Sequence, residues 1–97
     1  MLRVTQDVVE LRHWAESRGA RPCRDPASGR IALSFPGDPC AFPVGWDEFE
    51  PAFMFSRSVF VYDEAPGSRR HFLGSWDEAH AFVAKAAGEA AARLDRA

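Results

Sequence analysis

Residues 45–62 read GWDEFEPAFMFSRSVFVY and form the densest run of aromatic and apolar side chains in the sequence. Trp46, Phe49 and Phe53 recur at positions i, i+3 and i+7, which places them on one face of an α-helix. Residues 59–62 follow as VFVY, an unbroken β-prone run that is typical of a buried strand. This stretch therefore predicts a short helix that leads into a central strand.

Pro51 leaves the start of this helix open between two alternatives. A start near Trp46 places the proline inside the helix, where it removes a backbone hydrogen bond and distorts the helix. A start at Glu50 places Pro51 at the first helical position, which tolerates proline because that N–H has no partner within the helix.

Helices are also expected at both ends of the chain. Thr5 is a candidate N-cap for a helix over about residues 5–18, and Gly19 is typical of the position just beyond a helix end. Ser75 and Glu78 match a capping box, which predicts a last helix over about 75–94. The apolar stripe of that last helix consists of Phe82, Val83, Ala86, Ala90 and Leu94.

Two β-hairpins are expected, one before and one after the central helix. Residues 20–24 and 30–35 flank the turn sequence DPASG, and Pro22 favours an edge position for the first of these strands because it cannot donate a hydrogen bond. The central strand and a further strand near 69–73 flank the turn sequence APGS. Between the hairpins, residues 36–45 contain three prolines and two glycines and predict an irregular loop, either ordered or mobile.

The predicted order is α-β-β-α-β-β-α, an α+β fold with about four mainly antiparallel strands in one sheet and helices packed on it. The 97 residues, of which 46% are hydrophobic and 27% charged, fit a single domain over 1–97. A domain of this size buries roughly 65% of its unfolded surface. Trp14, Trp46 and Phe60 are the expected large core residues.

Composition points to a cytoplasmic protein without a membrane partner. Charges interrupt the amino terminus where a signal peptide needs an apolar core, and no apolar run approaches the roughly 18 residues of a membrane span. The net charge of −2 gives no long-range attraction for nucleic acid. Cys23 and Cys40 match neither a disulfide framework nor a paired metal-binding spacing, so reduced thiols are the default expectation.

Two acidic pairs suggest a small hydrolase as one alternative function. Each pair follows a tryptophan, and paired carboxylates beside aromatic rings are typical of glycosidases. The pairs are Asp47 with Glu48 and Asp77 with Glu78. Both also fall in the first turn of a predicted helix, where the helix dipole favours negative charge. That role accounts for all four acids, so we expect no catalytic residue.

Basic and metal-ligating residues suggest further alternatives. Four arginines could gather around the first hairpin as a basic patch for RNA, namely Arg18, Arg21, Arg24 and Arg30. The net negative charge argues against that RNA-binding alternative and favours a solvated surface. The histidines at positions 13, 71 and 80 have no third ligand at a metal-motif spacing, so neither a metal nor a cofactor is expected.

The chain resembles a family of short uncharacterised bacterial proteins with a T-x-D-x-x-x-[IL]-R-x-W-A-E-x-R-G opening and a W-D-E-F helix. The matching residues are Thr5, Asp7, the LRHWAE segment 11–16, Arg18, Gly19, Pro22, the strand 31–35 and the WDEF segment 46–49. The chain departs from the pattern at Ala20, where the family prefers glycine, and at Pro51. The resemblance implies no activity, ligand or catalytic residue. Some members carry a glucan-branching-enzyme label, but that chemistry needs a barrel of about 250 residues.

The VFVY strand carries the functional expectation, because its side chains are apolar on both sides and both sheet faces must therefore be covered. Either the last helix covers the second face, or a protein partner does, most simply a second copy in a homodimer. The candidate interface residues are Phe53, Met54, Phe55, Phe82 and Val83. We therefore expect a non-catalytic protein-interaction or assembly module.

Overall fold

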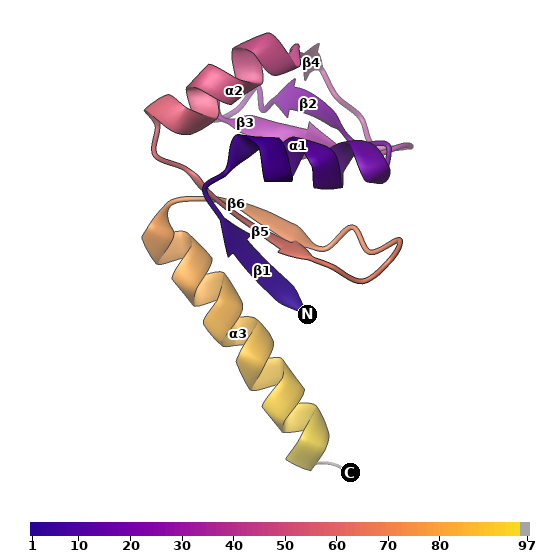
Figure 1. Ribbon diagram of the computed structural model, residues 1–97, viewed down its shortest axis with the longest axis vertical. Helices are drawn as coiled ribbons and strands as arrows, with labels where there is room; N and C mark the ends of the chain where they lie inside the picture. The colour runs from indigo at the N-terminus through magenta and orange to yellow at the C-terminus, as the bar shows by residue number, and fades with distance from the viewer. Residues whose placement is uncertain (96–97) are drawn as a thin grey trace.

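The computed structural model describes the backbone of residues 1–95 and the side chains of residues 1–89, and it confirms the predicted α+β class (Figure 1). The elements in chain order are β1 (Leu2–Thr5), α1 (Val8–Ser17), β2 (Arg21–Arg24), β3 (Ile31–Ser34), β4 (Phe42–Pro43), α2 (Trp46–Phe55), β5 (Val59–Asp63), β6 (His71–Gly74) and α3 (Trp76–Asp95). The predicted helices and hairpins are present. The short strands β1 and β4 add to the predicted order.

The two hairpins lie in separate antiparallel sheets, so the expectation of a single sheet is wrong. Sheet A has the order β1-β5-β6, and sheet B has the order β3-β2-β4. Each hairpin pairs with a third strand of its own: β1 pairs with β5, and β4 pairs with β2. The two hairpins therefore do not pair with each other. In Figure 1, α3 lies on one side of sheet A, and α1, α2 and sheet B lie on the other.

Strand β5 is buried on both faces, as its VFVY sequence predicts. Phe60 and Tyr62 pack into the larger core together with side chains of α1 and α2, among them Trp14 and Phe49. Val59 and Val61 form a second core with Ala79, Phe82 and Val83 of α3. The molecule's own last helix therefore covers the second face, which is the intramolecular one of the two alternatives.

The expected core aromatics are placed as follows. Trp14 and Phe60 are buried, which confirms two of the three expected core positions. Trp46 is half-buried at the start of α2 and packs against the edge of the larger core, where its ring meets Phe49 at a centroid distance of 5.1 Å.

Helix α1 begins at Val8 rather than near residue 5, and its N-cap is Asp7 instead of Thr5. The Asp7 carboxylate accepts a hydrogen bond from Val9 N at 2.9 Å. Thr5 belongs to β1, and its hydroxyl accepts from Asp7 N at 3.0 Å. The helix cannot begin before Asp7, because the backbone of Thr5 is already used in strand pairing. Gly19 follows the helix with φ of +71°, as the sequence indicates.

The starts of the other two helices settle the remaining helix predictions. Helix α2 begins at Trp46, so Pro51 lies inside it, which is the first of the two alternatives. Helix α3 opens on the predicted capping box, because Ser75 N donates to Glu78 Oε1 and Glu78 N donates to Ser75 Oγ, both at 3.2 Å.

Strand β2 is the middle strand of sheet B, so the edge position expected from Pro22 is wrong. Asp25 N donates to Arg30 O at 2.8 Å, and the antiparallel alternation then directs the backbone of Pro22 away from β3 and toward β4. There its carbonyl accepts from Val44 N at 3.3 Å. The missing N–H of Pro22 costs no pairing with β3 for this reason.

The loop 36–45 is ordered around β4 and is tied to β2 by a disulfide between Cys23 and Cys40, with a Cα–Cα distance of 6.2 Å. The expectation of reduced thiols is therefore wrong for this structure. The pairing of β2 with β4 brings the loop beside Cys23. A two-residue strand has no recognisable sequence signal, so the two cysteines could not be recognised as neighbours from their spacing.

Candidate interaction surface

The four acids of the hydrolase alternative do not assemble into a catalytic pair. Asp47 and Glu48 are exposed at the start of α2, and Glu48 pairs with an arginine of β2. A cleft of about 320 Å³ lies where the end of α2 meets the start of α3, but Glu78 is the only acidic residue among those that line it. A glycosidase needs two carboxylates facing one substrate bond. This cleft provides one, which already serves as a helix cap.

Glu78 shows what these acids do at the start of a helix. Its carboxylate accepts from the backbone N–H of Ser75, and this hydrogen bond lowers the pKa of Glu78. Arg30 lies 3.7 Å away and adds a favourable charge interaction. The low pKa keeps Glu78 ionised, which suits a capping carboxylate and is the opposite of what a general acid requires.

The four arginines of the RNA-binding alternative are divided among separate tasks. Arg24 pairs with Glu48 at 3.5 Å, and Arg30 pairs with Glu78. Arg18 is turned toward the β5–β6 turn, and Arg21 is the one of these four that is exposed without an ion pair to a described residue. Two of the four charges are thus compensated by carboxylates, and a third is held in a turn by backbone carbonyls, so the four arginines do not form one free basic patch.

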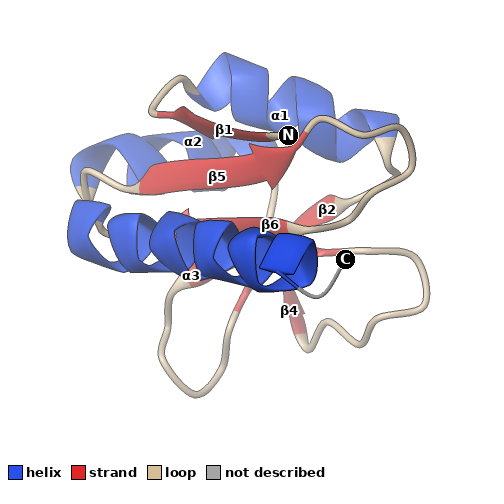
Figure 2. Ribbon diagram, turned by 90° about the horizontal axis from the view of Figure 1, so that it is seen from below, coloured by secondary structure: helices blue, strands red, loops and turns tan. Residues whose placement is uncertain are grey.

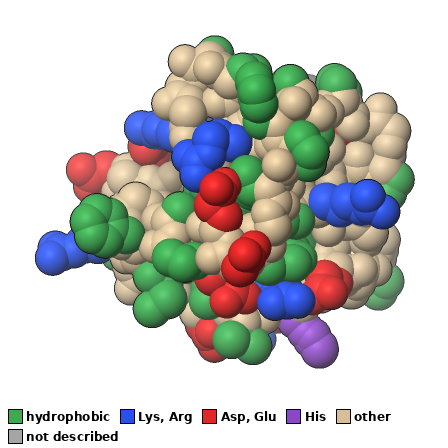
Figure 3. All heavy atoms as spheres, turned by 90° about the horizontal axis from the view of Figure 1, so that it is seen from above, with side chains coloured by type: hydrophobic (Ala, Val, Ile, Leu, Met, Phe, Trp, Pro, Cys, Tyr) green, Lys and Arg blue, Asp and Glu red, His purple; other side chains and the backbone are tan. Residues whose placement is uncertain are grey.

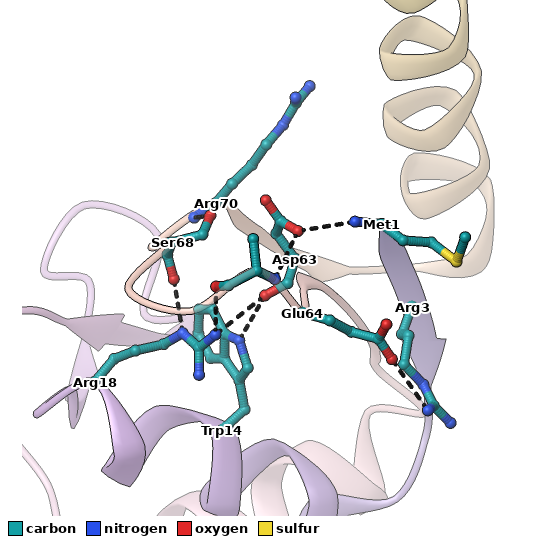
Figure 4. Close-up of polar contacts among 9 residues, drawn as sticks. Met1, Arg3, Trp14, Arg18, Asp63, Glu64, Ser68 and Arg70 are labelled. Atoms are coloured by element: carbon teal, nitrogen blue, oxygen red, sulfur yellow. Dashed lines mark hydrogen bonds and ion pairs between the residues drawn. The ribbon is translucent and has the colours of Figure 1, made fainter.

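Arg18 organises the turn between β5 and β6, a role that the sequence does not reveal. Its guanidinium donates to the carbonyls of Ser68 at 2.7 Å and Ala65 at 2.9 Å, and it stacks 4.6 Å above the Trp14 ring (Figure 4). The Trp14 indole N–H donates to Asp63 O at 2.9 Å. The backbone N–H of Ala65 holds the pKa of the Asp63 carboxyl at about 2, well below its usual range. These bonds fix the end of β5.

Histidines and cysteines do not form a metal or nucleophile site in the described part of the chain. His13 and His80 are exposed, whereas the His71 ring lies against Trp14 and Phe35. Among residues 1–89, whose side chains the structure describes, no three His, Cys, Asp or Glu side chains are grouped to hold a metal ion. Both thiols are consumed in the disulfide.

The expected interface residues do not form one surface. Phe53 is 1% exposed and belongs to the core. Phe82 and Val83 lie on the face of α3 that packs against β5, and both are half-buried. Only Met54 and Phe55 are exposed, near the end of α2. Figure 3 looks onto this end of the molecule and shows hydrophobic side chains in separate groups between charged ones. The last two residues of the predicted apolar stripe, Ala90 and Leu94, have side chains outside the described part of the chain.

A different surface is open at β1, the edge strand of sheet A. Figure 2 looks onto sheet A from the side of α3 and shows the helix crossing in front of β6 while β1 stays clear of it. Val4 is 45% exposed on β1, although Leu2 on the same face is half-buried against the smaller core. The helix therefore covers one side of this face and leaves the β1 side uncovered.

The backbone of β1 also has unused hydrogen-bonding groups. Glu64 N donates to Met1 O at 3.1 Å, and the antiparallel alternation then makes Arg3 and Thr5 the residues that bond to β5. The N–H and C=O groups of Leu2 and Val4 point to the free edge. Outside strand pairing, no hydrogen bond among residues 1–95 uses them.

The other edge of sheet A, at β6, faces sheet B. His71 of β6 contacts Phe35, which follows β3, and Leu73 of β6 packs against the larger core, as Ile31 and Leu33 of β3 do. The edge at β1 is therefore the one that faces away from sheet B. The alternation of Leu2 and Val4 before Asp7 is the sequence signal that could have indicated this strand.

Charge at the free edge is compensated within the molecule. Arg3 Nη1 donates to Glu64 Oε1 at 3.1 Å and its Nε lies 4.0 Å from Glu10 Oε2. The hydrogen bond to Glu64 raises the pKa of Arg3. A strand that approaches this edge meets no uncompensated charge.

These features describe an α+β domain with an open sheet edge at β1. Searches against family models, curated proteins and solved structures found no match to this chain. None of the helices in residues 1–95 combines the length and the apolar character that crossing a membrane requires.

Proposed function

We propose that the protein is a non-catalytic assembly module that pairs with a second copy of itself through β1. The observation that carries this proposal is the free edge of β1 beside the uncovered part of sheet A. A free edge presents a row of donors and acceptors that another strand can pair with. Natural edges are commonly protected by short strands, charged side chains, proline or a bulge. The four-residue strand β1 contains no proline, and its one charged side chain, Arg3, is paired with Glu64 and Glu10.

A second copy is the occupant that fits this edge best. Antiparallel pairing of a strand with its own copy has two-fold symmetry, so one strand supplies both halves of the interface. The two copies of sheet A would join into one continuous six-stranded sheet. Val4 would then contact its counterpart on the uncovered face, which removes apolar surface from water.

One register satisfies the backbone and the charges together. The outward groups belong to Leu2 and Val4, so these residues must form the hydrogen-bonded pairs. Pairing Leu2 with Val4 of the second copy would set Arg3 opposite Arg3, where like charges repel. Pairing Leu2 with Leu2 would leave Val4 without a partner strand. The remaining register sets Val4 opposite Val4 and Arg3 opposite Thr5.

Cysteine cross-linking tests this register. In an antiparallel hydrogen-bonded pair the Cα atoms lie about 5.5 Å apart, which a disulfide can span. We expect Val4→Cys to give a disulfide-linked dimer under mild oxidation. Leu2→Cys is the matched control, because Leu2 lies opposite Gln6 in this register and an offset of four strand positions separates its two copies by roughly 13 Å. Cross-linking of Leu2→Cys but not Val4→Cys would contradict the proposal, as would no cross-linking of either.

The remaining expectations from the sequence stay predictions. The family resemblance adds no residue role, and no contact among the described residues favours hydrolysis or RNA binding. A cytoplasmic location conflicts with a permanent disulfide, because the cytosol keeps most thiols reduced. That location is compatible with this structure if the disulfide opens and closes without unfolding the chain.

A further inference from the structure

The segment 39–43, here called the strap, is attached to the rest of the molecule mainly through the disulfide. Its strand β4 pairs with β2 at only two positions, Cys23 with Pro43 and Arg24 with Phe42. Because Val44 N donates to Pro22 O, the alternation places Pro43 at a non-hydrogen-bonded position, and Phe42 is the strap residue whose backbone bonds to β2. Apart from half-buried Cys40, every strap residue is exposed. Little else keeps the strap on β2 when the disulfide is open.

The disulfide is accessible to a reductant from two sides. A cleft of about 420 Å³ reaches Cys40 from the side of Phe35 and Pro43, and a second cleft of about 270 Å³ is lined by both cysteines. Cys40 is half-buried, whereas Cys23 on β2 is only 7% exposed. Thiol–disulfide exchange requires the attacking thiolate to reach one sulfur along the S–S axis. Cys40 lines both clefts and is the more exposed of the two cysteines, so its sulfur is the more accessible target.

The folded core does not depend on the disulfide. Neither cysteine belongs to the two clusters of buried side chains that hold the helices on sheet A. Strands β2 and β3 remain paired through four register positions without the strap. Opening the disulfide therefore removes the attachment of the strap and leaves both cores in place.

We infer that the disulfide between Cys23 and Cys40 is a reversible clasp, opened by dithiol reductants, that releases the strap from β2. A thiolate of the dithiol attacks Cys40 Sγ, the S–S bond breaks, and Cys23 leaves as a thiolate that takes up a proton. The second thiol of the reductant then displaces Cys40 from the mixed disulfide. The dithiol is oxidised to a disulfide, and the chain gains two electrons and two protons as two free thiols.

Release of the strap changes the surface of sheet B. It uncovers the part of the β2 edge that β4 occupies, at Cys23 and Arg24, whereas Val44 beyond the strap stays packed against the larger core. This site lies on a different sheet from β1. The clasp and the proposed self-pairing are therefore separate features of the molecule.

Dithiothreitol under native conditions tests the clasp. We expect both cysteines to become available to iodoacetamide without denaturant. In hydrogen–deuterium exchange, the peptide that covers 39–45 should exchange at least about tenfold faster after reduction, whereas the β5 peptide 59–63 should not change. The variant Cys23→Ser/Cys40→Ser should show the fast strap exchange with and without dithiothreitol.

Three results would each overturn the inference. Alkylation only after denaturant is added would mean that the disulfide cannot be reached in the folded state. Faster exchange in 59–63 on reduction would mean that the whole fold depends on the disulfide. Unchanged exchange in the strap after complete reduction would mean that β4 is held by its strand pairing alone.

Discussion

Replacement of Phe60 by alanine tests the packing of the central strand. Phe60 is fully buried, and its ring lies 5.4 Å from the Trp14 ring and 5.6 Å from the Tyr62 ring between centroids. Phe→Ala at a fully buried site costs about 3 to 5 kcal/mol, because it removes apolar contacts and leaves a cavity. The total unfolding free energy of a small domain is about 5 to 15 kcal/mol. Phe60→Ala therefore removes a large share of the stability.

The assay is urea denaturation followed by tryptophan fluorescence, with Phe55→Ala as the matched control. Phe55 has the same side chain but is 92% exposed, so its removal should change the unfolding free energy by less than about 0.5 kcal/mol. Phe60→Ala should also lower the Tm by at least about 12 °C, since 1 kcal/mol corresponds to about 4 to 8 °C in a domain of this size. If Phe60→Ala is too unstable to purify, Phe60→Leu should show a smaller loss. Equal effects at both positions would refute the assignment of Phe60 to the core.

Three further predictions concern stability. Burial and a hydrogen bond to Glu10 raise the pKa of Tyr62 to about 12, so the stability that its neutral hydroxyl contributes is complete below pH 10 and lost as the pH rises toward 12. Between pH 10 and pH 12 the unfolding free energy of Tyr62→Phe should therefore fall less than that of the wild type. An equal fall in both proteins would count against this role of Tyr62. Arg57 has φ of +52°, so Arg57→Gly should raise the unfolding free energy by about 1 kcal/mol in urea melts, and a decrease would contradict the strain at this residue. Removing the disulfide by Cys23→Ser/Cys40→Ser should lower the unfolding free energy by about 3 kcal/mol, because the 17-residue loop is no longer closed in the unfolded chain. An unchanged midpoint of urea denaturation would contradict this.

Local sequence patterns predicted the elements that depend on neighbouring residues. The VFVY run indicated a strand buried on both faces, because the period of two in a strand assigns its residues to opposite sides of the sheet. The capping box at Ser75 and Glu78 predicted the start of α3 within a residue, since both hydrogen bonds are local. The two hairpins followed from turn residues for the same reason.

Features that depend on distant residues could not be predicted. Strand β1 has four residues and exists because β5 pairs with it, and β4 has two and is joined to β2 by the disulfide. Phe53 was expected in an interface as well as on the core face of its helix, and the structure places it in the core. The free edge at β1 follows from strand order, which the sequence left open.

Self-pairing through β1 is tested most directly by light scattering of the wild-type protein and Val4→Pro across a concentration series. The proposal predicts that the wild-type mass rises from 10.8 kDa toward twice that value at high micromolar concentration. Val4→Pro removes an outward N–H that β5 does not use, so this variant should stay folded by circular dichroism and remain at the monomer mass. A wild-type mass that stays at 10.8 kDa throughout, or a Val4→Pro variant that dimerises as wild type does, would contradict it.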